Sequence, residues 1–363
     1  MVLARKIVKR GPRDFRRVEL IEDGQKIRIG LDEFTSATGK FGIIDRFSSG
    51  HARIGKVTLI DEDEKLVERQ VEELEPGSIQ TGAEVEWTPD IFFSPKSISA
   101  EYKDVFVPTA YGEAPAWLLE GDPRGTWVIH IHGSWTDRSI MLRDVDAFRG
   151  WGFSSLVPTF RSDPEVIPRQ GSSSHLGQTE WRDIESAINY ALSEGAKNIV
   201  LSGWSLGGTM ALLAAENSVH RDKIVGVVLV GPVTSWRQTI IAGAARAGVP
   251  EFAARLLIKL LGFSTFSKLL ALEEPIDFRL LEWSDTPGRL QTPTLILHSK
   301  ADKEVPWELS DRFQKGNPVY ATLVTLPDSL HTQEWNTAPE QFVRVLNEWI
   351  GKNILSADTR QQD

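Results

Sequence analysis

The sequence of 363 residues contains no cysteine and no long apolar run. The absence of cysteine excludes disulfide bonds, zinc sites built on thiolates and a cysteine nucleophile. No stretch approaches the roughly 20 consecutive apolar residues that a helix needs to cross a bilayer. The basic N-terminus is not followed by an apolar segment, so we expect no signal peptide and a cytoplasmic protein.

The chain also lacks an excess of positive charge. Its formal net charge is −9 at pH 7, which argues against a nucleic-acid partner. Basic side chains gather only in residues 5–17, which we interpret as a solvated N-terminal segment, with a patch for a membrane surface as the alternative. The acidic run at 61–64 is interpreted as a solvated turn and not as a metal site. The sequence leaves the oligomeric state open.

Two patterns of hydrophobicity divide the chain. Residues 15–95 contain short alternating segments broken by Gly, Asp and Ser, which predict a small β-rich N-terminal module over 1–100. Beyond residue 100, apolar runs alternate with helical patterns. The six runs lie at 126–133, 153–160, 198–204, 224–232, 294–300 and 321–327. Runs that are apolar on both faces are typical of buried parallel strands, so the pattern predicts a doubly wound, mostly parallel α/β sheet.

Helices are predicted between these strands. Residues 179–195 show helical spacing and end at Gly195. The segment 337–351 opens with Thr337 and Glu340 at the spacing of a capping box.

One connection is too long for a simple loop. The stretch between the predicted strands at 224–232 and 294–300 is too long for a structureless loop. We therefore predict a helical insertion over 237–290 that covers one end of the sheet. Within it we expect one apolar helical face made of Phe252, Leu256, Leu257, Leu260 and Phe263. The sheet domain then comprises 101–236 and 291–352, followed by a polar tail over 353–363.

The stretch IVLSGWSLGG places Ser205 between two glycines where a predicted strand meets a helix. A tight strand-to-helix turn brings neighbouring backbone close to the serine, and glycine at 203 and 207 removes the side chains that would clash. Such a turn lifts the hydroxyl clear of the sheet, so Ser205 is the candidate nucleophile. A serine hydroxyl needs a base, and the base needs an orienting group.

His331 follows the last predicted strand, and Asp302 follows the strand before it, so they are the candidate base and acid. Glu304 is the alternative acid, whereas Asp328 is interpreted as loop structure. Two other groups of histidines, His130 with His132 and His298, lie in predicted buried strands and are interpreted as packing or hydrogen-bonding residues.

Two backbone N–H groups are expected to stabilise the oxyanion of an acyl-transfer reaction. We assign one to Leu206 and the other to Ser134 in the loop HGSW, with Trp135 as the alternative if the register differs by one.

An apolar substrate pocket is the second feature expected near these loops. Trp135, Phe160, Trp204 and Trp335 are its candidate members, with ordinary packing as the alternative. Arg161 is a candidate partner for a substrate carboxylate, although an ion pair with Asp163 or Glu180 is the favoured interpretation.

The segments HGSW, GWSLGG, HSKADKEVP and HTQEWN resemble those of the α/β-hydrolase superfamily, and FRSD and HLGQTEWRD resemble bacterial hydrolases near the dienelactone-hydrolase and prolyl-oligopeptidase-like branches. The resemblance covers about 126–351 and implies a serine hydrolase, mostly acting on esters, without a metal or organic cofactor. The sequence departs from it in having HGS where many esterases have HGGG, and HSK where glycine commonly follows the histidine.

We therefore expect a carboxylic-ester hydrolase that acts on a small-molecule ester. A peptidase or amidase with the same triad, lipid hydrolysis at a membrane surface, and a non-catalytic binding protein on the same fold are the alternatives. The sequence leaves the natural substrate and the role of the N-terminal module open.

Overall fold

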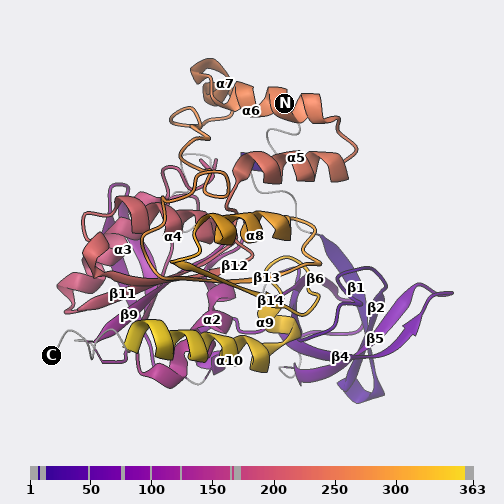
Figure 1. The fold of residues 1–363 in the computed structure, drawn as a ribbon. Helices are drawn as coiled ribbons and strands as arrows, with labels where there is room; N and C mark the ends of the chain where they lie inside the picture. The colour runs from indigo at the N-terminus through magenta and orange to yellow at the C-terminus, as the bar shows by residue number, and fades with distance from the viewer. Residues whose placement is uncertain are drawn as a thin grey trace.

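The computed structural model describes residues 7–8, 14–47, 50–74, 78–98, 100–122, 125–163, 166 and 173–355. Most of the basic N-terminal segment and residues 356–363 of the predicted tail lie outside these ranges, so their predictions are not tested. Two sheets organise the rest of the chain: a closed barrel and an eight-stranded sheet (Figure 1). Every helix in the described ranges is too short or too polar to span a bilayer.

The N-terminal barrel is formed by six antiparallel strands, with β6 closing onto β1 in the order β1-β2-β5-β4-β3-β6. The strands are β1 (Phe15–Ile21), β2 (Lys26–Gly30), β3 (Phe41–Asp45), β4 (His51–Asp61), β5 (Leu66–Leu74) and β6 (Glu84–Thr88). Alternate residues such as Ile27 and Ile29 point inward and are buried, while the intervening charged residues face outward. The predicted β-rich module is confirmed, although the sequence pattern did not reveal that it closes into a barrel.

The larger sheet has the order β14-β13-β12-β11-β9-β10-β8-β7. Its strands are β7 (Lys103–Thr109), β8 (Gly112–Leu119), β9 (Thr126–Ile131), β10 (Ser154–Pro158), β11 (Asn198–Trp204), β12 (Ile224–Val230), β13 (Thr294–Ser299) and β14 (Ala321–Leu326). The strands from β9 to β14 run parallel, whereas β8 pairs antiparallel with both β10 and β7. Each of the six apolar runs contains one of these parallel strands, so the predicted α/β sheet is confirmed.

Helices cover both faces of this sheet (Figure 1). One face packs against α3 (Trp181–Ser193), α4 (Leu206–Asn217) and α8 (Trp307–Gly316). The other packs against α2 (Leu142–Phe148), α9 (Glu334–Thr337) and α10 (Pro339–Ile350). Both faces are buried, which is why these strands are apolar throughout.

The predicted capping box at Thr337 is wrong. Thr337 ends α9, and α10 begins at Pro339 after Ala338, with no side-chain cap. The hydroxyl of Thr337 donates instead to the carbonyl of Thr38 in the barrel at 3.2 Å. Thr337 therefore makes a tertiary contact with the barrel and does not cap the helix.

The insertion between β12 and β13 contains α5 (Trp236–Arg246), α6 (Glu251–Leu261) and α7 (Ser264–Leu269). These helices stand beyond one end of the sheet (Figure 1). The predicted helical insertion is therefore present. The predicted apolar face of α6 is only partly correct, however. Leu257 is buried, but Phe252 is 73% exposed, Leu256 is 54% exposed and Phe263 is 51% exposed. Ala254 and Leu261 complete the face that packs inward.

Candidate active site

Ser205 lies in the tight turn between β11 and α4. Its backbone has φ 54° and ψ −116°, a conformation that costs free energy for a residue with a side chain. A Cβ atom at Gly203 would lie 2.3 Å from the carbonyl oxygen of Gly207, and one at Gly207 would lie 2.0 Å from that of Ile131. Glycine is therefore required at both positions, as the sequence pattern predicted.

The structure brings Ser205, His331 and Asp302 into one hydrogen-bonded line. His331 Nε2 lies 2.8 Å from Ser205 Oγ, and His331 Nδ1 lies 2.6 Å from Asp302 Oδ2. The three residues come from the ends of β11, β13 and β14, which are separate in the chain but meet at the carboxyl edge of the sheet. Gly231 makes room for the ring, because a Cβ atom there would lie 3.3 Å from His331 Nδ1.

Asp302 is held by hydrogen bonds to both of its oxygens. Oδ1 accepts from the backbone N–H groups of Glu304 at 2.8 Å and Val305 at 2.9 Å. Oδ2 lies 3.0 Å from His298 Nε2 as well as beside His331. Burial alone would raise the pKa of Asp302, but the charge of His331 and the hydrogen bonds of His298 and His331 hold the pKa well below its usual range. Asp302, and not Glu304, is the carboxylate that contacts His331.

The same environment makes His331 a strong base. Burial lowers the pKa of His331, but the charge and hydrogen bond of Asp302 outweigh burial, with a contribution from nearby Glu304, and raise the pKa to about 9. An imidazole with a raised pKa binds the serine proton more firmly once it has accepted it.

A third buried group, Glu334, lies behind this line at the start of α9. One of its oxygens accepts a hydrogen bond from the N–H of Ser299 at 3.2 Å, and burial raises its pKa to about 7. Ligand atoms of His298, Asp302 and Glu334 lie within 4.8 Å of one another, a grouping that can hold a metal ion. Both ring nitrogens of His298 are already hydrogen bonded, to Asp302 and Ser310, so we interpret the cluster as support for the carboxylate.

The residues predicted to hold the oxyanion come from two segments near Ser205. Leu206 is the first residue of α4, directly after the serine. Ser134 and Trp135 line the cavity in front of the serine, and Trp135 has a positive φ of 63°. The loop approaches closely because residue 133 is glycine, where a Cβ atom would lie 3.2 Å from the Cβ of Ser205.

Only two of the four predicted pocket aromatics line this cavity, namely Trp135 and Trp204. Phe160 is buried and stacks on His132 with ring centroids 4.2 Å apart. Trp335 is buried beside Phe92, with ring centroids 5.9 Å apart. Predicting the pocket from chain position alone was wrong for Phe160 and Trp335, because both side chains point into the core.

Arg161 does not face the cavity either. Its guanidinium makes two hydrogen bonds to Asp183, at 2.9 and 2.8 Å. Arg161 therefore forms a structural ion pair, which was the favoured interpretation. Its partner is Asp183, however, and not the predicted Asp163 or Glu180.

Sequence reasoning missed most of the cavity. Its volume is about 730 Å³, and its walls come from the loops around Ser205, from α5 and from the barrel. Trp236 and Ile240 contribute the α5 wall, and Phe34 and Trp87 belong to the barrel. No signal in the sequence linked the barrel to the serine, because no local pattern shows how the barrel docks against the larger sheet.

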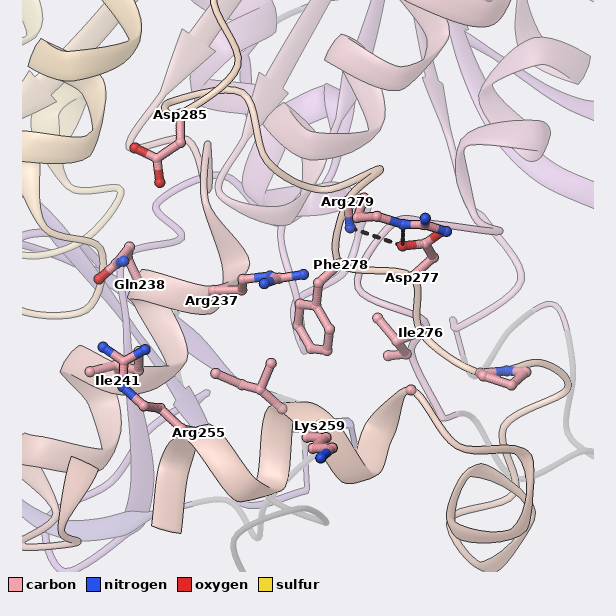
Figure 2. A pocket seen from close by; sticks show the side chains of 13 residues that line it. Arg237, Gln238, Ile241, Arg255, Lys259, Ile276, Asp277, Phe278, Arg279 and Asp285 are labelled. Atoms are coloured by element: carbon pink, nitrogen blue, oxygen red, sulfur yellow. Dashed lines mark hydrogen bonds and ion pairs between the residues drawn. The ribbon is translucent and has the colours of Figure 1, made fainter. Parts of the chain in front are cut away.

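A second cavity, of about 700 Å³, lies on the other side of α5 (Figure 2). Arg237 and Ile241 line it from α5, and the segment that returns to the sheet contributes Phe278 and the paired Asp277 and Arg279. It contains none of the residues around Ser205. The helix α5 thus separates two hollow spaces.

Two segments of the chain match models of known protein families. Residues 128–345 match the family model described as the alpha/beta hydrolase family. Residues 17–88, which include most of the barrel, match a model described as a domain of unknown function, DUF8805. No curated protein sequence matches the chain.

Solved structures share the fold of the larger domain. The Pyrococcus furiosus esterase Pf2001 is 22% identical, with a TM-score of 0.54, and the alignment covers 72% of this chain and 95% of the esterase. DcsB, solved in complex with its substrate analogue, is 17% identical with a TM-score of 0.52, covering 70% of this chain and 99% of DcsB. A membrane phospholipase A, described as a bacterial virulence factor, is 13% identical with a TM-score of 0.50, covering 71% of this chain and 88% of the phospholipase. At these identities the likeness establishes the fold alone. The family model spans more than half of the residues, and the chain therefore belongs to the alpha/beta hydrolase family.

Proposed function

We propose that the protein is a serine hydrolase that cleaves a carboxylic ester through an acyl-enzyme intermediate. The observation that carries the proposal is the line from Ser205 Oγ through His331 to Asp302, with contacts of 2.8 and 2.6 Å. Membership of the alpha/beta hydrolase family supports the hydrolytic chemistry, and the esterase among the solved structures agrees with an ester as substrate.

In the first half-reaction, Ser205 Oγ attacks the ester carbonyl carbon while its proton passes to His331 Nε2. The negative charge that develops on the carbonyl oxygen is stabilised by the N–H groups of Leu206 and Ser134, each worth on the order of 3 kcal/mol. Asp302, which stays ionised, orients the ring and stabilises its charged form. The tetrahedral intermediate then collapses, and the leaving alkoxide takes the proton from Nε2 and departs as an alcohol.

In the second half-reaction, His331 accepts a proton from a water molecule that attacks the acyl-enzyme. The same N–H groups hold the oxyanion again. Collapse of this intermediate returns the proton to Ser205 Oγ, releases the carboxylic acid and restores the starting state.

Labelling with a fluorophosphonate tests the nucleophile. We expect the folded wild-type protein to label and Ser205→Ala to lose both the label and hydrolysis of p-nitrophenyl acetate by at least about 10⁴-fold. Ser202→Ala is the matched control, because Ser202 lies on the same strand and its buried hydroxyl has no hydrogen-bond partner among the described residues. Retained label in Ser205→Ala, or no label on folded wild type, would contradict the proposal.

The preference for esters is tested separately. p-Nitrophenyl esters should turn over faster than aminoacyl p-nitroanilides of the same acyl group. Equal or faster turnover of the anilides would keep the nucleophile but replace the ester with an amide.

A further inference from the structure

We infer that the N-terminal barrel is part of the active site and forms the wall that binds an apolar group of the ester. This inference rests on the proposed function and adds a substrate class to it: esters with an extended or aromatic apolar group. The cavity that contains Ser205 and His331 is bounded on one side by the barrel and its flanks. The side chains on that side are Asp14, Arg16, Phe34, Glu86, Trp87 and Pro89.

The aromatic side chains give this wall its apolar character. Phe34, in the loop between β2 and β3, is 37% exposed although it lines the cavity. Trp87 is held from behind, because its ring lies 5.2 Å from the ring of Phe41 and 5.2 Å from the guanidinium of the buried Arg69. The barrel therefore lines the cavity with two aromatic side chains, the partly exposed Phe34 and the closely packed Trp87.

The cationic side chain in this part of the wall, Arg16, is already paired with carboxylates. Arg16 pairs with Asp32 at 2.8 Å and with Asp14 at 3.1 Å, and its guanidinium lies 6.0 Å from the centre of the Phe34 ring. Because two carboxylates of the barrel satisfy this cation, Arg16 supports Phe34 and is not set up to bind a substrate carboxylate. The wall thus favours a neutral apolar group over an acidic one.

The barrel is also fixed relative to the reacting atoms. Asn336 lies five residues after His331, and its side-chain N–H₂ donates to the carbonyls of Lys40 at 2.5 Å and Pro89 at 2.8 Å. The N–H of Lys40 donates in return to the carbonyl of Asn336 at 3.1 Å. Gly39 permits this approach, because its φ is 128° and a Cβ atom there would lie 2.4 Å from the same carbonyl oxygen.

Size links the wall to substrate choice. The cavity of about 730 Å³ is at the larger end of the usual range for small-molecule sites. An acetyl ester bound at Ser205 occupies a small part of it and leaves the barrel untouched. A longer acyl chain or an aromatic group fills the space toward Phe34, so the barrel discriminates between large and small esters.

The test measures kcat/KM for p-nitrophenyl acetate and p-nitrophenyl octanoate with Phe34→Ala. We expect the ratio of the octanoate value to the acetate value to fall about tenfold, because apolar contact area is lost for the longer acyl chain. Phe47→Ala is the matched control, since Phe47 belongs to the same barrel, is 84% exposed and does not line the cavity. Phe34→Trp should keep or raise the preference for octanoate.

Each outcome decides one question. An unchanged ratio of octanoate to acetate in Phe34→Ala, or the same change in Phe47→Ala, would overturn the role of the barrel while hydrolysis itself continued. Absence of acetate turnover and of fluorophosphonate labelling in the wild type would instead overturn the proposed function. A melting temperature for Phe34→Ala within about 2 °C of the wild type would show that the change is confined to the cavity.

Discussion

The two walls of the catalytic cavity are supported in different ways. Behind the barrel wall lies a packed core: Trp87 rests on Phe41 and Arg69, and the barrel is hydrogen bonded to Asn336. Behind the opposite wall, α5, lies a second cavity of about 700 Å³ (Figure 2). One wall is therefore backed by a closely packed core, whereas the other has a cavity between it, α6 and the segment that returns to the sheet.

This difference in support predicts that one wall keeps its shape and that the other can move. A wall that stands on a close-packed core keeps its shape, because moving it would disrupt many contacts. A helix with a cavity on its far side loses fewer contacts when it shifts, and such elements often admit or enclose substrates. We therefore expect the barrel to set which esters fit, and the insertion to adjust to them.

Among variants that compare the two walls, Asn336→Ala is expected to have the largest effect on stability and kcat, because it removes hydrogen bonds that hold the barrel. The side chain of Asn336 accepts a hydrogen bond from Arg143, which also donates to the carbonyl of Thr332 beside His331 at 3.2 Å. Removing it takes one hydrogen-bond partner from the buried guanidinium and the amide donor from two barrel carbonyls, at a cost of about 3 kcal/mol in the free energy of unfolding. The loop of His331 should loosen, and we expect kcat for p-nitrophenyl acetate to fall about 100-fold.

Asn217→Ala provides the comparison for this variant. Asn217 is exposed, and its amide donates to the carbonyl of Leu213 within α4, so kcat should not change. Chemical denaturation and steady-state kinetics measure both quantities. If Asn336→Ala lost stability but kept kcat, the barrel would support the fold without positioning the base.

The turn around Ser205 could be predicted because its causes are local. Two glycines, a strand before them and a helix after them lie within ten residues, and steric contacts between these neighbours dictate the glycines. The parallel strands were equally predictable, since burial on both faces leaves a continuous apolar run. The positions of Asp302 and His331 followed from the order of strands in the sheet.

The barrel wall could not be predicted in this way. The sequence around Phe34 does not distinguish it from other loop aromatics, and its place in the cavity of Ser205 depends on how the barrel docks against the larger sheet. The face of α6 shows a related limit, because Leu256 and Leu257 are both apolar and only the orientation of the insertion decides which one is buried. Thr337 has the spacing of a helix cap, but a contact with the barrel claims its hydroxyl.

The second prediction concerns how kcat/KM depends on pH through the protonation of His331. His331 must be neutral to accept the proton of Ser205, and its pKa is raised to about 9. We expect kcat/KM for p-nitrophenyl acetate to rise about tenfold per pH unit below this pKa and to reach half of its maximum near pH 9. In Asn336→Ala, where contact with Asp302 should loosen, the half-maximum should move toward the ordinary histidine value. An identical midpoint in both proteins would indicate that the barrel does not influence the base.

Stability should follow the opposite trend. The folded-state pKa of His331 lies above its unfolded value of about 6.5, so the stabilisation is fully present below about pH 6.5 and is lost as the pH rises through about 9. The difference in melting temperature between the wild type and His331→Gln should therefore shrink across this window.

The smallest effect on activity is expected in the insertion wall, where Leu261→Ala and Leu256→Ala form a matched pair on α6. Leu261 is fully buried, so its truncation should cost about 3 kcal/mol, whereas Leu256 is 54% exposed and should cost less than about 0.5 kcal/mol. Because α5 and α6 pack together above the cavity, Leu261→Ala should lower kcat/KM for p-nitrophenyl octanoate a few-fold and leave the acetate value unchanged. Denaturation curves and the two kinetic constants check this. A loss of acetate turnover as large as that in Asn336→Ala would mean that the insertion, like the barrel, holds the catalytic groups, and the contrast between a fixed and an adjustable wall would fail.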